Sequence, residues 1–283
     1  FSGSKIIDQF QDQFAPYLFF GCNMKEYYYG TLFRFPLRSI NHNSKIKSQP
    51  YSREKIMSLL NQFKANIVHS MIFLRHVKKI SVYLNSEENA EPALLYEAFV
   101  SKRDDKEWSS LTNFLNPSIS KEAMYGRLMR TPEDQLPKCT QKVEITSRMK
   151  NTSSGQMKTQ TDDFLVAQRI GGGEARNMAC NKDNSNMKLI PWGGVAAHIN
   201  ASRRVGRAFC FLPLPAETGL SVHVHGYFEL SSDRRNIWFG DDMAGEGATR
   251  AQWNAALLRD IVAPCYQQLL LAAGQLFGPS EKD

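Results

Sequence analysis

Two arginines lie in a short apolar run, Gly30-Thr31-Leu32-Phe33-Arg34-Phe35-Pro36-Leu37-Arg38. If this run is extended, Arg34 and Arg38 share one face and three apolar side chains occupy the other. We therefore predict a strand over residues 30–38 that positions guanidinium groups instead of only filling a core. Arg34 is expected at a boundary or in a site.

Two histidines, His223 and His225, lie two residues apart in a predicted strand over residues 222–230. They share a face of that strand, and both could reach one metal ion. The sequence places no third ligand beside them, and histidines on a sheet face more often pack or hydrogen-bond. We therefore predict no metal site, with these two residues as the only candidate ligands.

A basic cluster contains Arg203, Arg204 and Arg207 and is the candidate site for an anion. Arginines bind phosphate groups without regard to base sequence, and such binding weakens as salt rises. No aromatic residues are interleaved with these arginines, as they are in many nucleic-acid-binding segments. A solvated charged loop is the alternative interpretation.

Three consecutive glycines, Gly171 to Gly173, precede Glu174 and a predicted helix. Glycines at a helix start let backbone N–H groups approach a phosphate, and the helix dipole favours an anion there. The run lacks both the GxxxxGK[ST] and the GxGxxG pattern. We therefore predict a strand-to-helix turn at this position.

The helices and strands that must position these residues predict an α+β fold, with mixed or antiparallel sheets packed by several helices and a long helix at the C-terminal end. A composition change suggests a helix-rich subdomain over residues 1–135 that contains the arginine strand, and a β-rich subdomain over residues 136–283; a single domain is the alternative. The predicted strands are 77–85, 93–100, 139–149, 156–170, 195–200, 208–214 and 222–230. The predicted helices are 6–20, 52–71, 106–115, 120–130, 174–187 and 249–276, the last interrupted at Pro264.

Bulk composition indicates a globular chain of 283 residues with 42% hydrophobic content. Its 35 basic and 28 acidic residues give a net charge of +7, which permits an anionic partner without requiring one. The five cysteines are odd in number and irregularly spaced, so we expect a reducing, cytoplasmic environment without a disulfide framework. No apolar run approaches the roughly 18 residues of a membrane span.

Several longer strings in this chain are specific enough to indicate a family. The first is Phe10-Gln11-Asp12-Gln13-Phe14-Ala15-Pro16-Tyr17, followed by the run from Gly30 to Arg38. The closing strings are Phe211-Leu212-Pro213-Leu214-Pro215, Val222-His223-Val224-His225-Gly226-Tyr227-Phe228 and Trp253-Asn254-Ala255-Ala256-Leu257-Leu258. Together these strings resemble the segment that follows the ATPase module in repeats of the sacsin family. The resemblance extends from about Phe10 to Ala273 and is weakest between Ala90 and Asn186.

The resemblance implies that a GHKL-type ATPase module, similar to that of ninety-kilodalton heat-shock chaperones, precedes this segment. The acidic base, the magnesium-binding asparagine and the glycine-rich lid of such a module have no counterpart here. We therefore expect no enzyme activity from the chain by itself and no cofactor, with ATP bound only by the adjacent module. By analogy with the heat-shock relatives, Arg34 or Arg38 is the candidate for sensing nucleotide. Pairing of both arginines within the fold is the alternative.

The function that the resemblance implies is that of a chaperone or co-chaperone segment, which binds proteins and relays the state of the ATPase module. The implied partners are that module, client proteins including cytoskeletal ones, and chaperones of the seventy-kilodalton heat-shock class. A structural spacer or oligomerisation scaffold is the first alternative. An anion-binding module for nucleic acid or phospholipid, using the cluster from Arg203 to Arg207, is the second.

Overall fold

The computed structural model describes residues 3–38, 49–85, 92–115, 118–151, 154–200, 205–240 and 244–278. The chain divides into two compact units, residues 1–61 and 62–283. The predicted boundary between residues 135 and 136 stays a prediction, and strands from both sides of that position belong to one sheet. Within the described residues, no helix combines the length and the apolar character needed to cross a membrane.

The first unit consists of short helical segments followed by an irregular chain. Residues 6–20, predicted as one helix, form three successive pieces: α1 (Gly3–Gln9), α2 (Gln11–Phe14) and the 3₁₀ helix η1 (Ala15–Phe20). The prediction of a strand over residues 30–38 is wrong, because residues 31–38 form no regular secondary structure. Pro36 has no N–H to donate to a neighbouring strand, and alternation alone supplies no strand to pair with.

Helix α3 (Arg53–Met71) begins where the sequence predicts a long helix, after Ser52. The Ser52 hydroxyl accepts a hydrogen bond from the Lys55 amide at 3.4 Å, as expected of a residue that caps a helix N-terminus. The C-terminal end of α3, from Ile67 to Met71, belongs to the second unit and is buried there.

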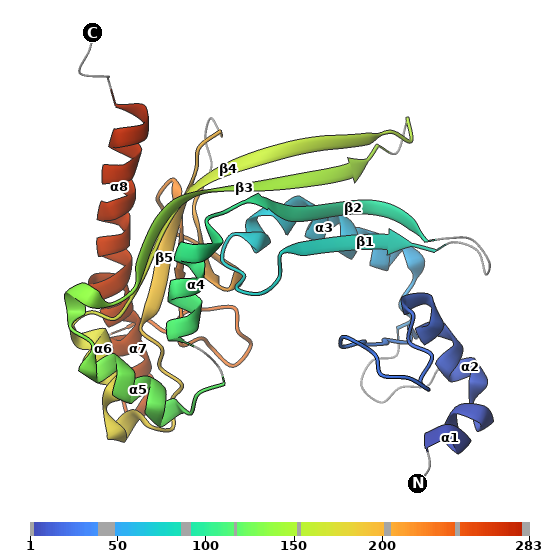
Figure 1. Ribbon diagram of the computed structural model, residues 1–283, viewed down its shortest axis with the longest axis horizontal. Helices are drawn as coiled ribbons and strands as arrows, with labels where there is room; N and C mark the ends of the chain where they lie inside the picture. The colour runs from blue at the N-terminus through green and yellow to red at the C-terminus, as the bar shows by residue number, and fades with distance from the viewer. Residues whose placement is uncertain are drawn as a thin grey trace. The chain divides into compact units, whose positions relative to one another are not determined.

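The second unit is built on one mixed sheet of eight strands in the order β1-β2-β3-β4-β5-β8-β6-β7, which confirms the predicted α+β class. All neighbouring strands are antiparallel except β6 and β8, which are parallel. Figure 1 shows the long β3–β4 hairpin beside β1 and β2. The strands are β1 (Lys79–Leu84), β2 (Ala93–Lys102), β3 (Lys138–Lys150), β4 (Met157–Ile170), β5 (Trp192–His198), β6 (Arg207–Cys210), β7 (Leu212–Glu217) and β8 (Val222–Gly226).

One predicted strand, over residues 208–214, is two strands in the structure. Strands β6 and β7 fold back on each other at Phe211, which has a φ of 62°. A bulky residue rarely adopts this left-handed conformation, so the sequence offers no turn residue that predicts the reversal.

Two hydrophobic cores occupy the two faces of the sheet, as the period of two along a strand requires. On β4, Phe164 and Val166 face the core that also contains the C-terminal end of α3. Leu165 and Ala167 face the larger core, which the helices α4 to α8 complete.

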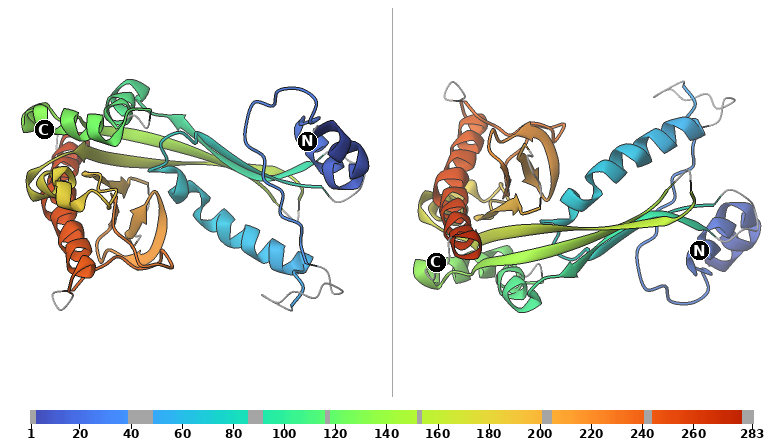
Figure 2. Two further views of the ribbon diagram at one scale, coloured as in Figure 1. Left: turned by 90° about the horizontal axis from the view of Figure 1, so that it is seen from below. Right: turned by 90° about the horizontal axis from the view of Figure 1, so that it is seen from above.

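Most helices of the second unit lie where the sequence predicts them, but the predicted helix over residues 174–187 ends at Cys180. Helix α8 packs against β4 and β5 (Figure 1). Pro264 lies in the first turn of α8, directly after the π-helical turn over residues 258–262, and residues 246–277 stay helical throughout, so the helix is not broken at this proline. Figure 2 shows β6–β8 between the C-terminal end of α3 and the helices α7 and α8. The segments are α4 (Asp105–Phe114), α5 (Lys121–Arg130), the 3₁₀ helix η2 (Glu133–Gln135), α6 (Gly173–Cys180), the 3₁₀ helix η3 (Lys182–Asn184), α7 (Glu246–Leu257), the π-helical turn η4 (Leu258–Val262) and α8 (Ala263–Phe277).

Candidate functional sites

The predicted nucleotide-sensing arginines lie in the irregular segment of the first unit. Arg34 donates a hydrogen bond from Nη1 to the Gln13 carbonyl oxygen at 2.6 Å, which ties residue 34 to the segment between α2 and η1. The Arg38 carbonyl accepts a hydrogen bond from the Tyr51 amide at 3.1 Å. The Arg34 side chain remains exposed. The roles of Arg34 and Arg38 toward nucleotide stay predictions.

Aromatic side chains on both sides of Gly30 are exposed to an unusual degree. Tyr27 and Tyr29 are 84% and 92% exposed, and Phe33 and Phe35 are 74% and 81% exposed. Each pair makes ring contact, edge-on for the tyrosines at 5.0 Å between centroids and stacked for the phenylalanines at 6.3 Å. Exposed apolar residues on one segment of a folded protein typically mark a surface for a partner.

A polar pocket of about 300 Å³ lies in the second unit, between α3 and strands β6 to β8. His69 and His223 meet edge-on in it, with ring centroids 5.1 Å apart. Arg207 and Asn66 also line it, and the Arg207 guanidinium donates from Nη1 to the Asn66 Oδ1 at 2.9 Å. The pocket therefore joins His223 and Arg207, which the sequence analysis had placed in different candidate sites.

The backbone selects the tautomer of a neutral His223 ring. Its Nδ1 accepts a hydrogen bond from the Arg207 amide at 3.1 Å, so in the neutral ring the proton is on Nε2. The side chain of Asn66 is oriented in a similar way, because its Nδ2 donates to the Gln62 carbonyl at 3.0 Å. The Asn66 Oδ1 is thus left to accept from Arg207.

A third histidine, His198, contacts His69 but does not line the pocket. Its ring centroid lies 6.2 Å from that of His69 and it stacks on Phe164 at 4.5 Å. Its Nε2 is 3.1 Å from the Asp162 carboxylate, and both side chains are almost fully buried. A protonated His198 would therefore form an ion pair with Asp162.

His225 lies on the same face of β8 as His223 but does not reach the pocket. It is fully buried among aromatic rings and stacks on Phe73 at 4.8 Å. Burial lowers the pKa of His225 to about 3, although the nearby Phe209 carbonyl opposes this shift. Among the residues that the structure describes, no three potential ligands gather to hold a metal ion. His225 is therefore a neutral core residue at physiological pH.

Of the predicted anion-binding arginines, Arg203 and Arg204 lie outside the described residues. Arg207 is exposed and begins β6. Within the described part of the chain, no carboxylate lies within ion-pair distance of its guanidinium. An anion-binding role for the cluster stays a prediction.

The glycine run from Gly171 to Gly173 forms the predicted strand-to-helix turn between β4 and α6. The anion at the start of α6 comes from the protein itself, because the Asp260 Oδ2 accepts a hydrogen bond from the Ala175 amide at 3.0 Å. The glycines allow this contact. A Cβ added at Gly172 would lie 2.7 Å from the Asp260 carbonyl oxygen.

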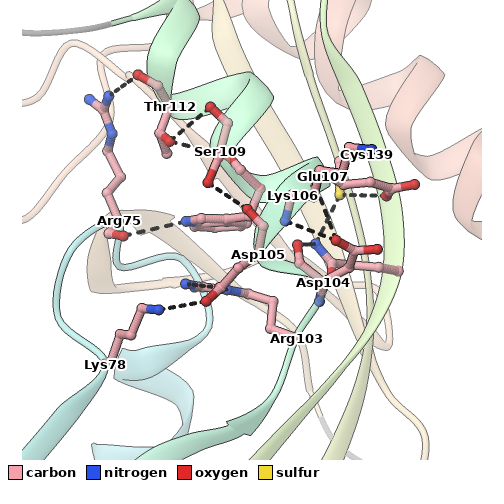
Figure 3. A network of polar contacts seen from close by, with 12 residues as sticks. Arg75, Lys78, Arg103, Asp104, Asp105, Lys106, Glu107, Ser109, Thr112 and Cys139 are labelled. Atoms are coloured by element: carbon pink, nitrogen blue, oxygen red, sulfur yellow. Dashed lines mark hydrogen bonds and ion pairs between the residues drawn. The ribbon is translucent and has the colours of Figure 1, made fainter.

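The start of α4 is held by a polar network that sequence analysis did not identify (Figure 3). The Asp104 Oδ1 accepts hydrogen bonds from the amides of Lys106 and Glu107 at 2.9 and 3.2 Å, which caps the helix. The Cys139 thiol lies 3.3 Å from the Glu107 carboxylate, to which it donates. Burial, reinforced by this carboxylate, raises the pKa of Cys139 to about 12, so its thiol is no nucleophile at neutral pH.

Sequence analysis missed His69 and Asn66, which line the histidine pocket, and His198, which contacts His69. The only signal in the sequence was that Asn66 and His69 are polar residues three apart on a helix whose neighbouring positions are apolar. Their partners are far away in the chain, and no local pattern connects them.

Comparison with known proteins shows the family to which this chain is related. Residues 2–97 match the family model described as the Sacsin domain. Human Sacsin is 32% identical to the chain over 257 residues, which cover 88% of this chain and 5% of the human protein. The chain is sacsin-related, as its sequence strings indicated. No solved structure matches it.

Proposed function

We propose that this chain is a non-catalytic segment of a sacsin-like chaperone or co-chaperone, which binds proteins and relays the state of an adjacent GHKL-type ATPase module. Its relation to Sacsin supports the larger context, since the chain spans 5% of the human protein. The partners in this proposal are the ATPase module, client proteins including cytoskeletal ones, and seventy-kilodalton heat-shock chaperones. A cytoplasmic location, where the five free cysteines would stay reduced, belongs to the same proposal.

The observation that carries the proposal is the exposed aromatic segment around Arg34. Phe33 and Phe35 flank this arginine and are both more than 70% exposed. Aromatic and arginine side chains dominate the binding energy of protein interfaces. Aromatic rings bury a large area with few rotatable bonds. The guanidinium is tied to Gln13, so less conformational freedom is lost when a partner binds.

The ATPase module is the partner assigned to this segment. A guanidinium keeps its charge at all relevant pH values and offers a planar set of donors to phosphate oxygens. An aromatic surface that holds Arg34 against the module would present that charge to bound nucleotide. The nucleotide state would then alter the affinity of the two parts for each other.

Binding between this chain and the separately expressed ATPase module tests the proposal. Titration calorimetry with ATP present should show saturable binding that the double variant Phe33→Gln/Phe35→Gln weakens at least about tenfold, the equivalent of roughly 1.4 kcal/mol. The matched control is Leu270→Gln/Leu271→Gln, since these α8 side chains are 52% and 63% exposed. Equal weakening by both double variants, or binding insensitive to the phenylalanines, would contradict the proposal.

A spacer or scaffold function is the second candidate, and the exposed apolar side chains of α8 favour it. Leu270, Leu271, Leu276 and Phe277 are all more than half exposed on this helix. A helix with such residues can associate with a second copy. Light scattering after size exclusion should then show an oligomer that Leu270→Gln/Leu271→Gln dissociates. A monomer at all concentrations contradicts this candidate.

A further inference from the structure

The histidine pocket offers a set of hydrogen-bond donors around the Arg207 guanidinium. Arg207 has five N–H groups, and a hydrogen bond to Asn66 uses one of them. No carboxylate of the described residues lies within ion-pair distance of the guanidinium. His69 and His223 line the same pocket. Its volume of about 300 Å³ is at the lower end of pockets that take small ligands.

The backbone under Arg207 is held in place by tight packing. The Gly206 amide donates to the Leu220 carbonyl at 2.7 Å, and the Gly206 carbonyl accepts from the Thr218 amide at 2.9 Å. A Cβ at Gly206 would overlap the Val222 carbonyl oxygen, at 1.8 Å. These contacts hold the backbone before Arg207, and the hydrogen bond to Asn66 orients the guanidinium, so less ordering is needed when a ligand binds.

One carboxylate also lines the pocket and restricts the chemistry of its ligand. Glu217 is opposite Arg207 in the β6–β7 pairing and is exposed. A carboxylate repels an anion that carries no proton, but it accepts a hydrogen bond from an anion that brings a hydroxyl group. Inorganic phosphate keeps a hydroxyl proton at neutral pH, whereas sulfate keeps none.

We propose that this pocket binds a small phosphate ligand with its own hydroxyl donor, either inorganic phosphate or a polyol phosphate. Arg207 pairs with the phosphate oxygens, Asn66 positions Arg207, and the imidazoles of His69 and His223 complete the polar wall. Glu217 accepts the ligand's hydroxyl proton in a hydrogen bond. No covalent step is involved. This site lies within residues 62–283 and is independent of the aromatic segment around Arg34.

Titration calorimetry of the full chain with inorganic phosphate, glycerol 3-phosphate and sulfate tests this assignment. We expect phosphate to bind at least about tenfold more tightly than sulfate at pH 7, the equivalent of roughly 1.4 kcal/mol. Arg207→Gln should weaken phosphate binding by at least about tenfold, as expected for loss of a charge-assisted hydrogen bond. Glu217→Gln should keep phosphate binding and reduce the preference over sulfate. Binding of glycerol 3-phosphate in place of inorganic phosphate identifies the polyol phosphate as the ligand.

The matched control is Arg235→Gln, which removes the same charge from an exposed arginine outside the pocket. It should leave phosphate affinity unchanged. His69→Asn is a second variant of the pocket and should also weaken phosphate binding. Circular dichroism should show that both His69→Asn and Arg207→Gln remain folded. The assignment is overturned if phosphate and sulfate bind alike, or if Arg235→Gln weakens binding as much as Arg207→Gln. It is also overturned if the chain binds vesicles that contain phosphatidic acid but neither inorganic phosphate nor glycerol 3-phosphate.

Discussion

The Asp260 carboxylate, in the π-helical turn η4, lies 3.0 Å from the amide of Ala175 in the first turn of α6. The two residues are 85 positions apart in the chain. The contact joins the C-terminal helix to the glycine turn after β4, and it places a negative charge at a helix N-terminus, where the helix dipole stabilises it.

Replacing Asp260 with Ala should lower the free energy of unfolding by about 1 to 2 kcal/mol, the usual effect of removing a side chain that caps a helix. Urea denaturation measures this change. Asp134→Ala is the matched control, because Asp134 is an exposed aspartate in η2. Equal stability of the two variants would show that the Asp260 contact contributes nothing.

The same contact predicts a dependence on pH. Burial opposes ionisation of Asp260, but the Arg259 guanidinium and the Ala175 amide outweigh it and hold the pKa of this carboxyl below its ordinary 3.8. A lowered pKa in the folded state stabilises the protein above the unfolded-state pKa, and this contribution disappears as pH falls through the folded-state value. The stability difference between wild type and Asp260→Asn should therefore be constant from pH 7 to 5 and shrink below pH 4.

Gly172→Ala tests how closely the glycine turn packs against the Asp260 backbone. Gly172 has a φ of 116°, which an alanine rarely adopts, and the added Cβ would lie 2.7 Å from the Asp260 carbonyl oxygen. We expect a loss of about 1 to 3 kcal/mol in unfolding free energy. Gly155→Ala is the control, since it shares the positive φ but has nothing within 4 Å. A loss no larger than that of Gly155→Ala would rule out a packing effect.

His225 predicts a second, separate dependence of stability on pH. Its pKa of about 3 lies below the ordinary value of 6.5, so between these values the unfolded chain binds the proton and the folded chain does not. Stability should therefore fall as pH drops below 6.5, by up to about 1.4 kcal/mol per pH unit from this residue. Urea denaturation between pH 5 and 8 should show a steeper decline for wild type than for His225→Asn. The exposed His76 supplies the control, and His76→Asn should decline as wild type does.

Arg34 and Arg38 are expected to affect ATP hydrolysis only when the ATPase module is attached. In the joined protein, Arg34→Ala or Arg38→Ala should reduce the hydrolysis rate by at least about tenfold, because a guanidinium that stabilises transferring phosphate contributes that much or more. Arg53→Ala is the control from the start of α3. Hydrolysis that neither Arg34→Ala nor Arg38→Ala changes would remove the nucleotide-sensing role.

In the isolated chain, where no ATPase module covers the aromatic segment, client binding is expected to depend on this segment as well. Light scattering of an aggregating client protein, without nucleotide, should be suppressed by the chain at near-equal molar ratio. Phe33→Gln/Phe35→Gln should abolish the suppression, because it removes the exposed rings that would cover apolar client surface. A folded wild-type chain that suppresses nothing would instead favour the spacer function.

Local signals in the sequence predicted the elements of the second unit well. The β3–β4 hairpin follows from two alternating strands around a turn that starts at Asn151, whose carbonyl accepts from the Gly155 amide at 2.8 Å. The helices α4 and α5 start after Asp104 and Ser120, both of which cap them through their side chains. In each case the deciding interactions lie within a few residues of one another.

Predictions that depended on distant partners were less successful. The alternation of residues 30–38 fits a strand, but a strand also needs a neighbour, and none is encoded in the run itself. The histidine pocket shows the same limit, because Asn66 and Arg207 hydrogen-bond across 141 residues. Only His223 and Arg207 could be selected from the sequence, and their common site required the pairing of β6 with β8.

The π-helical turn η4 sets the rotation of α8 about its own axis. A π-helical turn contains one residue more than an α-helical turn, and each residue rotates the helix by about 100°. Deleting one residue between Leu258 and Val262 would therefore turn every later side chain about the helix axis. Cys265 and Leu269 would leave the core, so this single extra residue determines which side of α8 faces the sheet.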